Sequence, residues 1–109
     1  MEQIKIYISN RNSDAHAEAI YEDGKVTVLP GGIISADFAN HIQGGDKAKM
    51  FRNSTEYVDK NRIIIKECVF QSPSTAAQFV TGQSRNGYEG WKVQPKVTLG
   101  KYLKSKGLR

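Results

Sequence analysis

Cysteine and long apolar runs are the scarcest features of this 109-residue sequence. Cys68 is its one cysteine, so the chain can form no internal disulfide and has no second thiol with which to share a zinc ion. No apolar run approaches the roughly 18 residues that cross a bilayer, and the start lacks the basic and then apolar pattern of a signal peptide. These absences argue against a secreted disulfide scaffold, a zinc finger and a membrane protein, and they predict a cytoplasmic location.

Motifs of common active sites are missing as well. His16 and His41 lie 25 positions apart, and the sequence contains no H-x-x-x-H, C-x-x-C, G-x-S-x-G or phosphate loop. Acidic pairs such as Glu22 and Asp23 fall in a predicted hairpin, where turn and surface chemistry explains them. We therefore expect a protein that is not an enzyme and that holds neither a metal nor a cofactor.

The basic residues are concentrated in the second half of the chain. Residues 1–59 carry six basic and nine acidic side chains, a net charge of −3, whereas residues 60–109 carry ten basic and two acidic ones, a net charge of +8. A positive half attracts polyanions, nucleic acid first among them. The same charge also fits a solubilising surface, so both interpretations stay open.

Length and hydrophobic pattern predict one domain over residues 1–109 with strands in its first part. A chain of this size has room for one core. The residues from Ile4 to Ile8 alternate with a period of two, as a half-buried strand does. Asp23-Gly24, between the segments 15–22 and 25–29, predicts a hairpin because both central residues of a type I′ turn have positive φ. We expect residues 33–35 to resume the second strand.

The middle of the chain has a weaker pattern. Within residues 36–61, Asp46 is a suitable cap for a short helix that runs through Tyr57. The following segment, Arg62 to Phe70, is rich in β-branched residues and predicts a strand that is buried at its centre and includes Cys68 as a small buried hydrophobe.

Two helices are predicted in the last third. Ser72 is a suitable N-cap, Pro73 fits the first helical position and Gly82 can end the helix, so we expect a helix over residues 72–81. Thr98 is a possible cap for a basic helical turn over residues 99–104, after which the tail is expected to fray. The whole chain thus predicts an α+β fold, a small antiparallel sheet with an N-terminal hairpin and one or two short helices packed on it.

Several of these residues also form a longer pattern. From Phe70 the chain reads F-Q-S-P-S-T-A-A, and G-Q-S-R-N-G, W-K and T-L follow it at Gly82, Trp91 and Thr98. This pattern resembles the F-x-S-P-S-x-A-A, G-x-S-x-N-G, W-K and T-L motifs of a prokaryotic domain-of-unknown-function family, numbered four-three-five-seven. The hairpin fits the family as well, so the resemblance covers residues 15–103.

The resemblance implies a small accessory domain whose activity is unassigned. Members of the family often follow GIY-YIG endonuclease domains. The motif is similar to that of the RAMA domain, which accompanies restriction and methylation enzymes and is proposed to bind DNA, modified or unmodified. The implied partners are therefore duplex DNA and a nuclease or methyltransferase subunit. Tyr88, where the related pattern often has Trp, and Gly32-Ile33, in place of Gly-Ser, depart from the family pattern.

Candidate contacts to nucleic acid gather after the predicted helix, and the principal ones are Arg85, Asn86, Tyr88 and Lys92. Arg85 and Lys92 carry charges that suit phosphates or guanine edges, and Asn86 matches an adenine edge. Tyr88 and Trp91 are flat surfaces for an unpaired base. Asn86-Gly87 is also an ordinary turn pair, and a lone Trp in a small domain is more often part of the core, which is our interpretation of Trp91.

Two further groups complete the candidate site. Ser74 and Thr75 lie in the first turn of the predicted helix, where free N–H groups and the helix dipole suit a phosphate, although plain capping is the better-supported explanation because every helix needs a cap. Lys96 and Lys101 belong to a lysine-rich stretch that can follow a phosphate backbone or simply keep the chain in solution.

These features support two functions. The first is a non-catalytic DNA-binding accessory module that works with restriction, modification or nuclease enzymes. The alternative is a protein–protein interaction or regulatory module, in which the predicted helix and the surface of Tyr88 and Trp91 dock a nuclease or methyltransferase. The two differ in their response to salt, because phosphate contacts make affinity fall steeply as the salt concentration rises.

Overall fold

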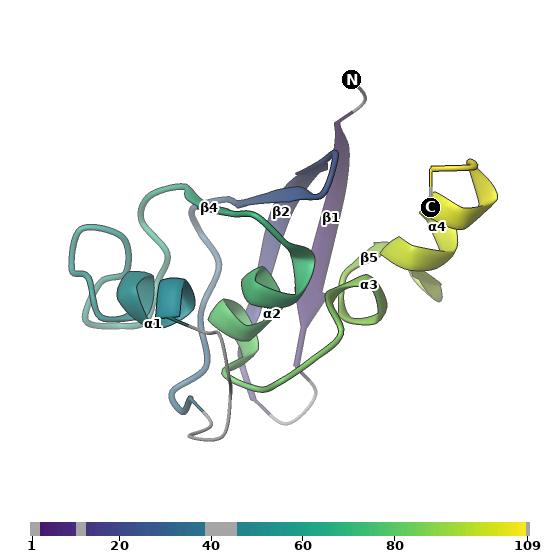
Figure 1. The fold of residues 1–109 in the computed structure, drawn as a ribbon. Coiled ribbons are helices and arrows are strands. Elements are labelled where there is room, and N and C mark those ends of the chain that lie inside the picture. The colour runs from purple at the N-terminus through teal and green to yellow at the C-terminus, as the bar shows by residue number, and fades with distance from the viewer. Residues whose placement is uncertain (1–2, 11–12, 39–45, 109) are drawn as a thin grey trace.

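A single antiparallel sheet organises the protein, as seen in a computed structural model that describes residues 3–10, 13–38 and 46–108 (Figure 1). Within these residues the strand order is β4-β3-β2-β1-β5-β6. The elements are β1 (Ile4–Ser9), β2 (His16–Glu22), β3 (Lys25–Val28), α1 (Asp46–Arg52), β4 (Cys68–Phe70), α2 (Pro73–Thr81), α3 (Gly87–Gly90), β5 (Lys92–Gln94), β6 (Val97–Thr98) and α4 (Leu99–Ser105). The predicted α+β fold is confirmed.

The predicted hairpin is confirmed as β2 and β3. Glu22 lies opposite Lys25 and Tyr21 opposite Val26, so the turn holds two residues. Those residues are Asp23 and Gly24, with φ of 48° and 88°, which is the backbone that a type I′ turn requires. The hairpin therefore forms because its turn sequence tolerates positive φ at both central positions.

The sheet has one buried face and one open face. Alternate residues of β1, β2 and β3 point into the core, among them Ile6, Ala19 and Val26, each 0% exposed. Helix α2 packs on that buried face through an apolar side that includes Phe79 and Val80 (Figure 1). Burying both apolar surfaces against each other is the main driving force for this two-layer arrangement.

Helix α2 begins and ends where the sequence predicts. The hydroxyl oxygen of Ser72 accepts a hydrogen bond from the Thr75 N–H, Pro73 occupies the first turn, and Gly82 has left-handed backbone with φ of 69°. All three signals act within the helix and at its ends, so the bounds of the helix do not depend on contacts with distant residues.

The predictions for the middle of the chain are only partly right. The helix that begins at Asp46 ends at Arg52 and not at Tyr57, and the strand predicted from Arg62 covers only β4. The cause is the Asp59 carboxylate, which accepts hydrogen bonds from the N–H groups of Asn61 and Ile63 and bends the chain. Residues 59–62 thus form a turn, and Ile63 and Ile64 form isolated bridges with Ile33 and Val58 instead of a regular strand.

Residues 33–35 do not resume β3 as a strand. Ile33 forms isolated bridges with His16 and Ile63, and the Ile34 N–H donates to the Arg62 carbonyl. Gly31, at φ of 103°, has turned the backbone away from the β3 direction. The segment therefore pairs with the start of β2 on one side and with the loop before β4 on the other.

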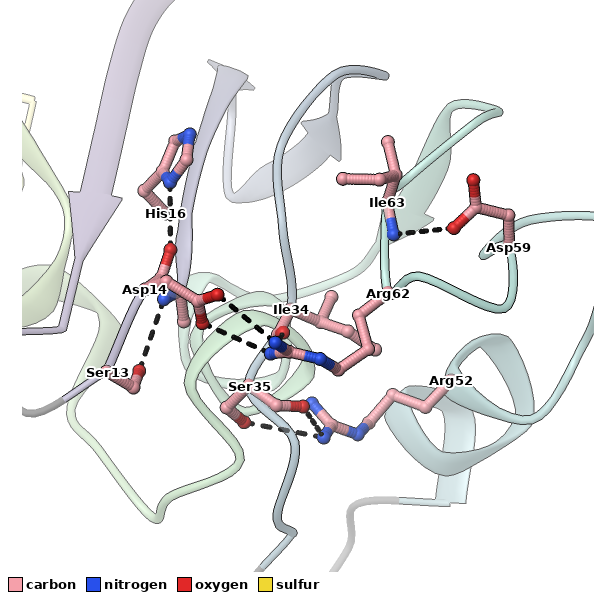
Figure 2. A network of polar contacts seen from close by, with 10 residues as sticks. Ser13, Asp14, His16, Ile34, Ser35, Arg52, Asp59, Arg62 and Ile63 are labelled. Atoms are coloured by element: carbon pink, nitrogen blue, oxygen red, sulfur yellow. Dashed lines mark hydrogen bonds and ion pairs between the residues drawn. The ribbon is translucent and has the colours of Figure 1, made fainter.

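Two arginines fasten this irregular region to the rest of the fold (Figure 2). The Arg62 guanidinium donates to both carboxylate oxygens of Asp14, each at 3.1 Å, and to the carbonyl oxygen of Ile34 at 2.8 Å. Arg52, at the end of α1, donates to the carbonyl oxygens of Phe79 and Ser35. Burial, with a smaller effect of the Arg62 charge, lowers the pKa of Arg52 to about 10, so it stays protonated at neutral pH.

The C-terminal part contains more structure than the sequence predicts. Helix α3 begins at the predicted turn pair Asn86-Gly87, and the hairpin of β5 and β6 that follows it was not predicted. Helix α4 begins at its predicted cap, where the Thr98 hydroxyl oxygen accepts from the Lys101 N–H. Beyond it, in the tail expected to fray, the N–H groups of Gly107 and Leu108 donate to the carbonyl oxygens of Lys104 and Leu103, the bonding of a Schellman motif.

Candidate nucleic-acid interface

A hollow of about 650 Å³ lies between the end of β1, helix α3 and the turn that joins β5 to β6. We call it the Tyr7 hollow, after the aromatic ring in its wall. Its lining includes three of the predicted contact residues, Arg85, Lys92 and Lys96, together with Glu89. These elements lie at the end of the molecule away from α1 (Figure 1). The fold thus brings together cations that are up to 11 positions apart in the sequence.

A second, adjoining hollow contains most of the other predicted residues. It measures about 340 Å³ and is lined by Asn86, Tyr88, Lys101 and Lys104, and we call it the Lys101 hollow. Glu89 lines both hollows and so stands at their border. The two hollows together form one surface on which charged side chains from α3, α4, β5 and the turn after it are exposed.

Close packing of α3 against α2 fixes the position of this surface. The Gly87 N–H donates to the Ser74 hydroxyl oxygen at 3.0 Å, and the Trp91 indole N–H donates to the Pro73 carbonyl oxygen at 3.0 Å. A Cβ atom on Gly87 would collide with the backbone of Pro73 and Ser74. Only glycine allows α3 to approach α2 this closely.

Gly90 makes room for the Arg85 side chain. A Cβ atom built on Gly90 would stand 3.4 Å from Nε of Arg85 and 3.2 Å from the side chain of Ile8. The guanidinium therefore lies against the backbone of α3, partly buried, and does not extend freely into solvent. A cation held in place loses less side-chain entropy when it binds a phosphate.

Lys92 and Lys96 reach the Tyr7 hollow from the hairpin of β5 and β6. Lys92 is the sheet partner of Tyr7 and is exposed, so both residues lie on the open face of the sheet. Lys96 follows Pro95 in the two-residue turn and has a φ of 67°. This left-handed backbone is unfavourable for a residue with a Cβ.

Within the described residues, the cations of this surface differ from several others in forming no ion pair. Lys5, Arg62 and Lys66 form ion pairs with Glu18, Asp14 and Glu56. Across the part of the chain that the structure describes, no ion pair involves the cations of the two hollows, which are Arg85, Lys92, Lys96, Lys101 and Lys104. Their positive potential is therefore available to an external anion.

Ser74 and Thr75 have roles within the fold. The Ser74 hydroxyl oxygen accepts the hydrogen bond from Gly87, and the hydroxyl of Thr75 is hydrogen-bonded to that of Ser72 at 3.0 Å. Helix α3 thus covers the α2 N-terminus that the sequence suggested as a phosphate cradle. Asn86 likewise caps α3, since its side-chain oxygen accepts from the Tyr88 N–H at 3.0 Å.

The two aromatic residues of the predicted loop have different environments. Trp91 is 0% exposed and belongs to the core, as its sequence context predicts. Tyr88 is partly buried against the core, and its side chain is hydrogen-bonded to that of Tyr21. Burial, and then the interaction with Tyr88, raise the pKa of Tyr21. Both rings are therefore occupied by contacts within the protein.

Sequence reasoning missed Tyr7 and Glu89. Tyr7 lies between the inward-facing Ile6 and Ile8, so the alternation of β1 already places it on the open face. The sequence gives no sign that β5 pairs beside it, because the pairing is non-local and joins Tyr7 to Lys92. Glu89 was missed because the sequence predicts a turn at Asn86-Gly87, where the structure forms helix α3.

The described residues offer neither a metal cluster nor a membrane span. Among them, no three histidine, cysteine, aspartate or glutamate side chains lie close enough together to hold a metal ion. No helix in the same residues has the length and apolar character needed to cross a membrane.

Comparison with known proteins identifies one family. The sequence model of a family described as "Domain of unknown function (DUF4357)" matches residues 6–103. The match confirms the resemblance seen in the sequence, begins within β1 and includes every described lining residue of the two hollows except Lys104. No curated protein and no solved structure matches the chain at a significant level.

Proposed function

The chain belongs to the DUF4357 family, whose function is unknown, and from this premise we propose that it is a non-catalytic accessory module that binds duplex DNA. The observation that carries the proposal is the group of five cations around the Tyr7 and Lys101 hollows, none of which forms an ion pair with a described residue. We propose a nuclease, restriction or modification enzyme as the partner whose chemistry the module positions on DNA.

The chemistry of the surface supports a phosphate contact. Arg85 precedes α3, Lys92 lies in β5 and Lys96 lies in the turn after it, and all three line one hollow, so one nucleic-acid strand can meet all three. Most protein–DNA hydrogen bonds go to phosphates and sugars, and they position the protein without reading sequence. Lys101 and Lys104 extend the positive surface along α4.

The lining of the hollows supports a binding role and not a catalytic one. The described lining of both includes one carboxylate, that of Glu89, and no histidine or cysteine. The usual nucleophile–base and paired-carboxylate arrangements therefore cannot form there from described residues. We accordingly include no chemical step in the proposed function.

The alternative function, docking of a partner protein, has less support than DNA binding. It relied on Tyr88 and Trp91 as an aromatic surface, but Trp91 is 0% exposed and Tyr88 is bonded to Tyr21. An apolar docking surface needs accessible aromatic area at its centre. DNA binding is therefore the function that we favour.

A salt titration tests the proposal. The affinity of the protein for a labelled 20-base-pair duplex should fall linearly on a log–log plot as salt rises, with a slope of about −0.9 per phosphate contacted. The double variant Arg85→Ala, Lys92→Ala should bind more weakly, and its slope should be shallower by about 2. Single-stranded DNA and RNA of the same sequence serve as competitors.

The matched control removes two cations elsewhere. Lys47 on α1 and Lys60 in the loop that follows are exposed, so Lys47→Ala, Lys60→Ala makes the same change in net charge away from the hollows. This control should leave the slope nearly unchanged. Equal weakening by both double variants, or no binding by the unaltered protein at low salt, contradicts the proposed function.

A further inference from the structure

We propose that the Tyr7 hollow takes one unpaired nucleotide, with its base stacked on the Tyr7 ring and its phosphate held by Arg85 and Lys96. This inference rests on the proposed function and specifies which part of the nucleic acid this hollow would bind. An unpaired nucleotide has two sources, a base extruded from a duplex and the overhanging end of a strand, and the same chemistry recognises both.

Tyr7 is the aromatic residue among the described residues that line this hollow. Its ring lines the hollow and is partly exposed on the sheet face opposite to α2, whereas Trp91 is fully buried and Tyr88 is bonded to Tyr21. Bases stack on such rings whatever their sequence, because every base has a π face. Paired bases keep their faces inside the duplex, so a stacking ring in a hollow suits an unpaired one.

The hollow has the size and charge for a nucleotide. Its volume of about 650 Å³ lies inside the range of roughly 300–1,000 Å³ usual for small-ligand pockets. Arg85, whose side chain lies beside Gly90, and Lys96, in the turn between β5 and β6, both line the hollow. A phosphate at the mouth can reach both while the attached base extends inward to Tyr7.

Glu89 favours a base over a phosphate alone. Its carboxylate repels phosphate, so a surface that only followed the backbone would gain nothing from placing it among cations. A carboxylate accepts hydrogen bonds from amino groups, which cytosine N4 and adenine N6 supply and which thymine lacks. The hollow should therefore prefer an unpaired cytosine or adenine to an unpaired thymine.

Three labelled 20-base-pair duplexes test the inference by fluorescence anisotropy: a fully paired one, one with a single extra cytosine in its centre, and one with a one-nucleotide cytosine overhang. The unaltered protein should bind at least one of the last two about 5- to 150-fold more tightly than the paired duplex, the usual effect of one stacked base. Tighter binding of the duplex with the extra cytosine would identify an internal base as the unpaired nucleotide, and tighter binding of the overhang duplex would identify a strand end.

Variants of Tyr7 and Glu89 then show which side chains produce the preference for an unpaired nucleotide. Tyr7→Leu should abolish the preference, and Tyr7→Phe, which restores the ring, should recover most of it. Glu89→Gln should reduce the preference for cytosine over thymine at the unpaired position. Circular dichroism and the fluorescence of Trp91 confirm that each variant is folded.

The two proposals fail in different ways. Salt-dependent binding without any preference for an unpaired nucleotide, or a preference that survives Tyr7→Leu in folded protein, overturns this inference and leaves the proposed function standing. A failure to bind all three duplexes at low salt overturns both.

Discussion

The Arg62 guanidinium and the Asp14 carboxylate form a two-pronged pair, Nη1 to Oδ1 and Nη2 to Oδ2, both at 3.1 Å. The pair joins the segment before β2 to the loop before β4, 48 positions away in the sequence. Hydrogen bonding to Arg62, against a smaller opposing effect of desolvation, lowers the pKa of Asp14 from its ordinary value of 3.8. The carboxylate is thus held ionised in the folded state.

This relationship predicts an acid-sensitive contribution to stability. Because the pKa of Asp14 is lower in the folded than in the unfolded protein, its contribution is fully present above its unfolded pKa and is lost as the pH falls through the folded value. Thermal melts of the unaltered protein and Asp14→Asn should therefore differ at pH 6 and converge below about pH 3. Asp46→Asn, on α1, is the control. A difference that stays constant down to pH 2 would contradict the assignment.

Arg52 should contribute more to stability because it is more buried. It donates to the carbonyl oxygens of Phe79, Ser35 and Asp37, and so satisfies acceptors at the end of α2 and in the loop beside it. Arg52→Met leaves these acceptors without a donor, and we expect the free energy of unfolding to fall by about 2–4 kcal/mol in a urea titration. Arg52→Lys, which keeps one charged donor, should lose about half as much. Equal losses would show that only packing of the side chain matters.

Gly87→Ala should separate α3 from α2. The added methyl group would collide with the Pro73 and Ser74 backbone, and overpacking of this kind costs about 1–3 kcal/mol. Since the indole N–H of Trp91 donates to the Pro73 carbonyl oxygen, its fluorescence should also shift to longer wavelength. Gly24→Ala, a glycine with open space around it, provides a comparison that is strained by backbone conformation alone, without such a collision.

Elements set by neighbouring residues could be predicted, and those set by distant contacts could not. Helix α2 follows from Ser72, Pro73 and Gly82, and the hairpin from Asp23-Gly24, all of which act within a few positions. The β-branched run from Ile63 has the composition of a strand. Its conformation depends, however, on two long-range contacts, the bridge between Ile63 and Ile33 and the ion pair between Arg62 and Asp14. Composition alone does not contain that information.

In the candidate site, too, the residues indicated by local sequence could be predicted and those brought in by distant contacts could not. Charge and turn residues indicated Arg85, Lys92 and Lys96, and the fold brings these three together in one hollow. Tyr7 joins them only because β5 pairs with β1, and nothing in either segment specifies that partner. Ser74 was a candidate phosphate contact beside a role in capping, and in the structure its hydroxyl oxygen accepts a hydrogen bond from the N–H of Gly87, a contact that the sequence does not reveal.

Cys68 should be inert in the folded protein. It is 0% exposed, and burial raises the pKa of its thiol to about 12, so very little thiolate forms at pH 8. Its reaction with a thiol reagent at pH 8 should be at least about 10³-fold slower than in 6 M guanidinium chloride. The buried thiol can ionise and meet the reagent only when the protein unfolds locally around it. A rate close to that of the denatured protein would show that β4 opens readily.

Lys96 allows stability and DNA binding to be separated. Its φ of 67° is unfavourable for lysine but not for glycine, so Lys96→Gly should leave the free energy of unfolding unchanged or raise it by up to about 1 kcal/mol. The same change removes a cation from the Tyr7 hollow, and the log–log salt slope for duplex DNA should become shallower by about 1. Lys92→Gly is the matched control: it also removes one cation, but it lies in β5, where glycine should cost about 0.5–1 kcal/mol. If Lys96→Gly lowers stability as much as Lys92→Gly, the backbone at Lys96 carries no strain; if it leaves the salt slope unchanged, Lys96 makes no phosphate contact.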